Sequence, residues 1–159
     1  MTDLSGIITP SNIVTASSTT TLTNKTLTSP TINGGTGTFS SIETEGAFTE
    51  DAEAITSSSN AATLDLSSAT NFTHTLSEDV TYTFSNPAAS GKASAFTLKV
   101  TQDATERTIT WPASVDWPGG TAPTVSADSG AVDYYVFITT DGGTNYYGFT
   151  AGQALATPA

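Results

Sequence analysis

Between Ala62 and Phe149 the chain consists of short runs in which hydrophobic and polar residues alternate. Successive side chains of a β-strand point to opposite faces, so a period of two indicates strands with one buried face. The connection Ser77-Glu78-Asp79 is short enough to join two such strands as a hairpin. The first four runs carry the following residues on their hydrophobic side: Leu64 and Leu66; Phe72, His74 and Leu76; Val80, Tyr82 and Phe84; Phe96, Leu98 and Val100.

The pattern changes toward the C-terminus. Ile109 and Trp111 predict one more short strand, and segment 114–123 is predicted to be a long loop. Residues 132–138 are apolar at nearly every position, which is typical of a central strand covered on both faces. The glycine-containing turn 139–145 then leads to a returning strand that carries Tyr146, Tyr147 and Phe149.

These runs predict an all-β domain over residues 60–159. About seven short strands with turn signals every 8–12 residues are the sequence pattern of an antiparallel β-sandwich or jelly roll. Residues 42–59 contain five acidic side chains and predict a short helix or an acidic connector between the arm and the domain.

Residues 1–41 have a different pattern, with one aromatic residue and long Thr/Ser runs. Leu22, Leu27 and Ile32 recur every five residues, a spacing that fits neither a helix nor a single strand. One apolar residue per block cannot build a core, so we expect an extended arm that is ordered only against copies of itself. The alternative is a flexible Thr-rich linker.

The net charge of the chain limits the classes of partner that it can bind. Fifteen acidic residues face four basic ones, for a net charge of -11, and phosphate backbones and anionic lipids are bound through Lys and Arg. We therefore expect no nucleic acid partner. No window approaches the ~18–20 apolar residues of a membrane span, so we expect no membrane insertion. The first residues lack the basic and apolar regions of a secretion signal, which favours assembly in a cytoplasm.

Candidate chemistry is sparse. Cysteine is absent, and the single histidine, His74, lies in phase with Phe72 and Leu76, as a packed core residue would. Three copies of His74 around a threefold axis could bind a metal, but the sequence favours the packed interpretation. The acidic residues, among them Glu43, Glu50 and Glu78, could in principle form a glycosidase pair or a calcium site, yet they lack the required spacing. We expect no catalytic, cofactor or metal residues.

Large amphipathic rings concentrate in the last 50 residues, and such rings are enriched in interfaces and in sugar-stacking sites. Trp117, inside the predicted loop, and Tyr146 are the candidates for an exposed surface contact. The other rings are assigned to the core or to a subunit interface.

Two stretches carry a family resemblance. TTTLTNKTLTSPTINGGT (residues 19–36) resembles a motif of fibre and other structural proteins of tailed bacteriophages. Residues 71–155 look like a C-terminal module of tail-fibre-like virion proteins, through TWPASV (110–115), WPGGTAP (117–123), DGG (141–143) and YGF (147–149). These motifs consist of residues typical of turns, loops and strand ends, and they contain no catalytic signature.

The resemblance implies a non-enzymatic virion protein. Such fibres are typically parallel homotrimers, in which Leu22, Leu27 and Ile32 would point inward. The leading hypothesis is a short trimeric fibre, anchored to tail, baseplate or capsid proteins by its arm, whose β-domain contacts a host-surface glycan or protein. The alternatives are a capsid decoration or head-fibre (cement) protein that binds no host and, more remotely, a carbohydrate-active domain.

Overall fold

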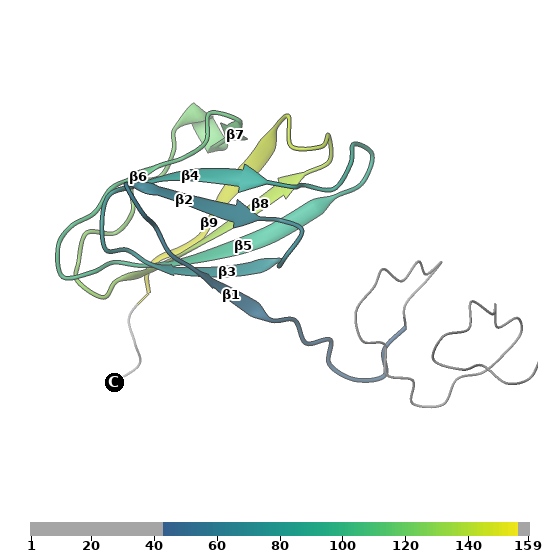
Figure 1. Ribbon diagram of the computed structural model, residues 1–159, viewed down its shortest axis with the longest axis horizontal. Coiled ribbons are helices and arrows are strands. Elements are labelled where there is room, and N and C mark those ends of the chain that lie inside the picture. Colours follow the sequence, from purple (N-terminus) through teal and green to yellow (C-terminus); the bar gives the residue numbers. More distant parts are fainter. Residues whose placement is uncertain (1–42, 156–159) are drawn as a thin grey trace, which may run out of the picture. The chain divides into compact units, whose positions relative to one another are not determined.

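The computed structural model describes residues 43–155, and the predictions for Leu22, Leu27 and Ile32 lie outside these residues. The described part is all-β, as predicted. It forms two sheets that share one core (Figure 1). The strands are β1 (Ala52–Ile55), β2 (Ala61–Asp65), β3 (Asn71–Thr75), β4 (Val80–Ser85), β5 (Ser94–Thr101), β6 (Ile109–Thr110), β7 (Val115–Asp116), β8 (Val132–Thr139) and β9 (Tyr146–Leu155).

The first six strands alternate between the two sheets. The large sheet has the order β1-β3-β5-β8-β9-β7 and the small sheet the order β2-β4-β6, and strands β1–β6 pair with one another only in parallel. Ala52 pairs with Asn71 and Ala61 pairs with Thr81, so the first winding of the chain takes about 20 residues. The later windings are longer, because Asn71 pairs with Thr97 and Val80 pairs with Ile109. The N-terminal half is therefore a flattened coil of parallel strands.

The prediction of an antiparallel sandwich or jelly roll is thus wrong in its pairing. The predicted hairpin at Ser77-Glu78-Asp79 does not form, because this connection carries the chain from β3 in the large sheet to β4 in the small one. The alternation of hydrophobic and polar residues predicts which face of a strand is buried, but it does not predict which strands pair or in which direction. Only β5–β8 and β8–β9 are antiparallel pairs.

The acidic connector also contributes to the fold. β1 lies within the predicted connector 42–59 and forms an edge strand of the large sheet, with Ile55 buried in the core. The compact unit that contains the β-domain begins at Thr44. The β-domain therefore begins earlier than the predicted residue 60. Residues 43–51 are exposed and contain no helix.

The core lies between the sheets. Phe96 and Phe137 of the large sheet stack at 5.1 Å between ring centroids, and Phe84 of the small sheet meets both rings edge-on at 5.0 Å. The small sheet is too narrow to cover β8 and β9. Loop 111–125 covers the remainder: the Trp111 ring lies 4.8 Å from Tyr135, and Trp117 lies 5.6 Å from Phe137.

Candidate functional site

The two residues predicted for surface contact are both buried. Tyr146 is 2% exposed, and its ring packs edge-on against Phe84 at 5.1 Å. Trp117 is 9% exposed, because its loop folds over the part of the large sheet that the small sheet leaves open. The expectation of an exposed contact at these positions is therefore wrong within the described chain.

The exposed rings are their neighbours on the outer face of the large sheet. Tyr147 and Phe149 are 51% and 47% exposed on β9, and Tyr134 and Ile138 are each 37% exposed on β8. Val136, half-buried, lies between them. The pairs Ile138–Tyr147 and Val136–Phe149 place these side chains next to each other across the two antiparallel strands. We call Tyr134, Val136, Ile138, Tyr147 and Phe149 the outer-face patch.

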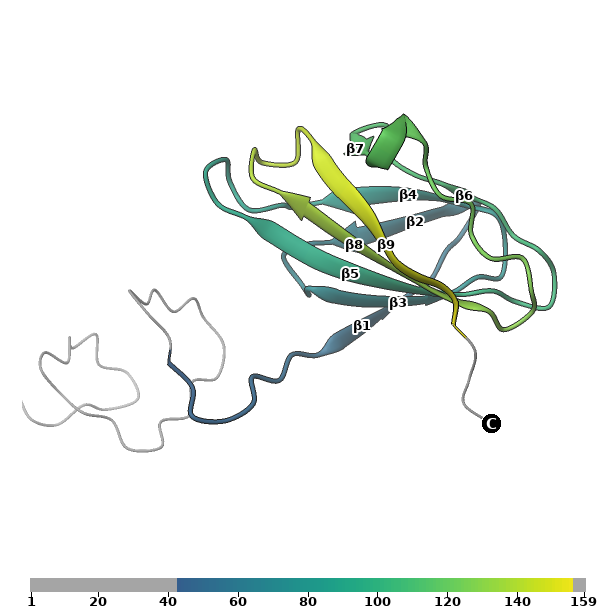
Figure 2. The same cartoon turned by 180° about the vertical axis from the view of Figure 1, so that it is seen from behind.

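This patch corrects a further prediction. Residues 132–138 were expected to be covered on both faces, yet the structure covers only one. Asp133, Tyr135 and Phe137 are buried in the core, whereas the alternate residues are exposed or half-buried. Figure 2 shows the large sheet from its outer side, with β8 and β9 side by side. The outward face of β8 is therefore apolar, and no other part of the described chain covers it.

Charged residues border the patch on opposite sides. Lys99 of β5 pairs with Tyr134, and Asp116 of β7 pairs with Tyr147. The ion pair formed within residues 43–155 joins Arg107 and Asp103, so Lys99 and Asp116 have no charged partner in that range. The outward residues of β5, β8 and β9 from Ala95 to Phe149 otherwise include no carboxylate.

A groove adjoins the patch at Phe149. Its volume is about 330 Å³, and Trp117, Pro118, Thr121, Pro123, Phe149 and Thr150 line it. It is formed where loop 117–123 wraps the β9 side of the large sheet, so apolar surface continues from the patch into the groove.

His74 has the packed role that the sequence favours. Its ring is 2% exposed, and Nδ1 lies 2.7 Å from the Tyr82 hydroxyl of the opposite sheet. Burial lowers the pKa of His74, partly offset by the nearby Glu78, so the ring is neutral at pH 7. Within residues 43–155 no group of three or more His, Asp or Glu side chains could hold a metal ion.

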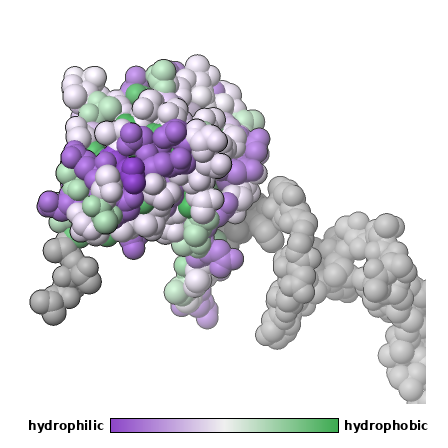
Figure 3. Space-filling view, turned by 60° about the vertical axis from the view of Figure 1, so that its left-hand side comes forward, coloured by the Kyte–Doolittle hydropathy of each residue, from purple (hydrophilic) through white to green (hydrophobic). Residues whose placement is uncertain are grey.

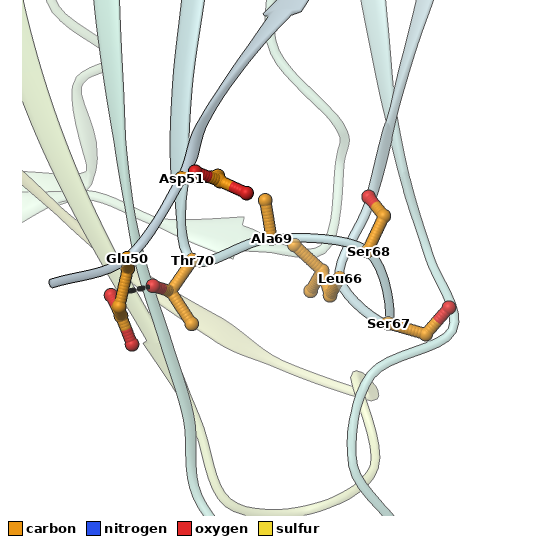
Figure 4. Close-up of a pocket in the computed structure, with 7 residues that line it drawn as sticks. All are labelled: Glu50, Asp51, Leu66, Ser67, Ser68, Ala69 and Thr70. Carbon is orange, nitrogen blue, oxygen red and sulfur yellow. Dashed lines mark hydrogen bonds between the residues drawn. The ribbon is translucent and has the colours of Figure 1, made fainter. Parts of the chain in front are cut away.

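The carboxylates that could have formed a glycosidase pair instead bind loops. In the hollow lined by Glu50, Asp51 and residues 66–70, Glu50 and Asp51 point away from each other (Figure 4). Glu50 accepts hydrogen bonds from the Thr70 hydroxyl and from the Asn71 amide at 2.9 Å. Asp79 accepts the Thr108 backbone N–H at 2.8 Å.

One buried carboxylate could not be identified from the sequence. Asp133 is 1% exposed and accepts hydrogen bonds from the backbone N–H and the hydroxyl of Ser126, the N–H of Ala154, the Tyr135 hydroxyl and, at 3.4 Å, the Gln153 amide. Burial opposes ionisation, but the hydrogen bonds outweigh it and lower the pKa of Asp133. Five hydrogen bonds on one carboxylate tie loop 123–131 to the end of β9.

Figure 3 shows one face of the molecule, on which strongly hydrophilic groups gather and hydrophobic side chains are scattered between them. None of the helical structure in residues 43–155 is long and apolar enough to cross a membrane.

Comparison of the chain with protein-family models, with curated proteins and with solved structures finds no match.

Proposed function

We propose that this chain is a structural protein of a tailed-bacteriophage particle: a short homotrimeric fibre, attached by the arm 1–41, whose β-domain is displayed for contact with the host surface. The proposal rests on where the residues of the C-terminal motifs lie in the fold. These motifs, at 110–115, 117–123, 141–143 and 147–149, come together around β7–β9.

Gly148 of YGF is required by this packing. A Cβ at this position would lie 2.8 Å from Val115 Cγ1 and 2.9 Å from Trp117 Cζ3, so the glycine lets the WPGG loop lie directly on β9. Gly143 of DGG has a φ of +81°, and a Cβ there would lie 2.5 Å from the Tyr146 hydroxyl. Side chains at either site would collide with the core, so both motifs serve architecture.

The two tryptophans of the motifs also pack against the core. Trp111 and Trp117 meet at 5.2 Å between centroids and cover Tyr135. A module whose tryptophans, Gly143 and Gly148 serve packing is what a rigid displayed knob needs. Three knobs on one fibre would bind a host surface multivalently, so each site can be weak.

The test is the location of the protein on purified particles, with gold-labelled antibody raised against the folded chain. Label at tail or baseplate appendages is the expected result. Label spread over the capsid lattice would replace the fibre by the decoration protein, and particles that carry no label and no peptide of this chain would overturn the proposal. Host contact is tested by competition, in which the purified chain should reduce adsorption of the phage.

A further inference from the structure

We propose that the outer-face patch is the surface through which the β-domains of two or more copies of this chain pack against each other. The inference concerns the β-domain itself. It does not depend on where in a particle the protein is located, and it adds a contact beyond the arm.

The size of the patch is the first argument. Four large side chains that are 37–51% exposed, together with Val136, present on the order of 400 Å² of apolar surface, taking roughly 200 Å² for a large side chain. This is the size of the largest apolar patch on a typical monomer, which is often functional, and a stable interface buries about 800 Å² per partner. The patch would supply the apolar centre of such an interface, and the groove beside Phe149 part of its rim.

Charge favours a second copy as the partner. Copies of a chain of net charge -11 repel one another, and this repulsion is weakest where the facing surface carries no carboxylates, as in the patch. The two borders of the patch carry opposite charges, Lys99 on the β5 side and Asp116 on the β7 side. An interface that sets the Lys99 border of one copy's patch against the Asp116 border of another brings opposite charges together.

The composition of the patch favours protein over glycan. Sugar-binding platforms combine rings with polar side chains that accept and donate hydrogen bonds. In this patch Val136 pairs with Phe149 and Ile138 pairs with Tyr147, and both β8 side chains are purely aliphatic. An apolar surface that is rich in aromatic rings and poor in charges is typical of an interface core.

The first experiment compares two full-length variants by sedimentation velocity over a range of concentrations. Phe149→Glu places a charge in the patch, and Thr75→Glu places the same charge on an exposed outward position of β3 outside it. Phe149→Glu should weaken association at least about 30-fold, as expected for loss of an interface anchor. Thr75→Glu should change it by less than about 2-fold, and circular dichroism should show both variants folded.

The second experiment reports on the patch even if the arm holds the assembly together. Because the chain has no cysteine, Ile138→Cys and Thr75→Cys each introduce a single thiol. A bulky maleimide should label the Cys at 138 at least about 10-fold more slowly than the Cys at 75, because packing covers the patch. The inference is overturned if both thiols react alike, if the wild-type chain is monomeric, or if a glycan binds a monomer through Phe149.

Discussion

At the scale of single residues, the structure fixes a residue by what lies directly against it. At Gly148, β9 lies under the Trp117 ring and the Val115 side chain, and there is no room for a methyl group. At Asp133, one carboxylate collects five hydrogen bonds at the end of the sandwich. The contacts of Gly148 come from residues far away in the sequence, and the donors to Asp133 come from loop 123–131, from β8 itself and from the end of β9. The alternation of β8 predicts that residue 133 shares a face with Tyr135, but the donors on loop 123–131 are visible only in three dimensions.

Gly148→Ala should destabilise the domain by about 1–3 kcal/mol, because the added methyl group collides with a ring and a branched side chain inside a packed core. Urea unfolding followed by tryptophan fluorescence measures the change. Gly46→Ala is the matched control, since a Cβ at Gly46 meets nothing within 4 Å. Equal stabilities for the two variants would show that Trp117 does not lie against β9.

Asp133→Asn should destabilise the domain by about 1–3 kcal/mol at pH 7, because the amide cannot accept all five hydrogen bonds. The pKa of Asp133 is lower in the folded state than its ordinary value of 3.8, so ionised Asp133 stabilises the fold above pH 3.8. This contribution is lost as the pH falls through the folded-state pKa. The stability gap between wild type and variant should therefore be full at pH 7 and shrink toward pH 2.

The control for this pH series is Asp128→Asn, on the exposed part of the same loop. It should leave stability within about 0.5 kcal/mol of wild type at every pH, as surface substitutions usually do. A gap for Asp133→Asn that stays constant down to pH 2 would contradict the role of its charge.

At the scale of elements, hydrophobic periodicity predicted the strands but could not predict their pairing. The alternation around His74 and Tyr82 correctly indicates two strands with buried residues in phase. It cannot tell whether a three-residue link turns back within one sheet or crosses to another. Here it crosses, and the inward faces of the two strands meet across the core at the His74–Tyr82 hydrogen bond. Likewise, residues 132–138 are apolar on both faces, which predicts that both faces are buried. The described chain buries only the face that meets the core.

The arm prediction belongs to this scale. Leu27→Asp should weaken or abolish assembly of the arm while leaving the far-UV circular dichroism of the β-domain nearly unchanged, because a charge at an inward position of the five-residue repeat would be buried between copies. Limited proteolysis measures the effect as faster cleavage within residues 1–41. Asn24→Asp adds the same charge between the apolar positions and should leave the cleavage rate unchanged. Equal protection of both variants would contradict the inward assignment of Leu27.

For the whole molecule, we propose that association of identical copies explains two apolar features of the chain. The sequence of the arm has one apolar residue per five, and the β-domain presents a carboxylate-free apolar patch on a chain of net charge -11. The acidic residues elsewhere would then keep the assembled copies in solution.

Sedimentation equilibrium of the full-length chain at micromolar concentration and pH 7 tests this central claim most directly. The account predicts a single species of three times the 16.2 kDa chain mass. A species of 16.2 kDa at every concentration would contradict it, because both the arm and the outer-face patch would then be without the partner they are proposed to bind.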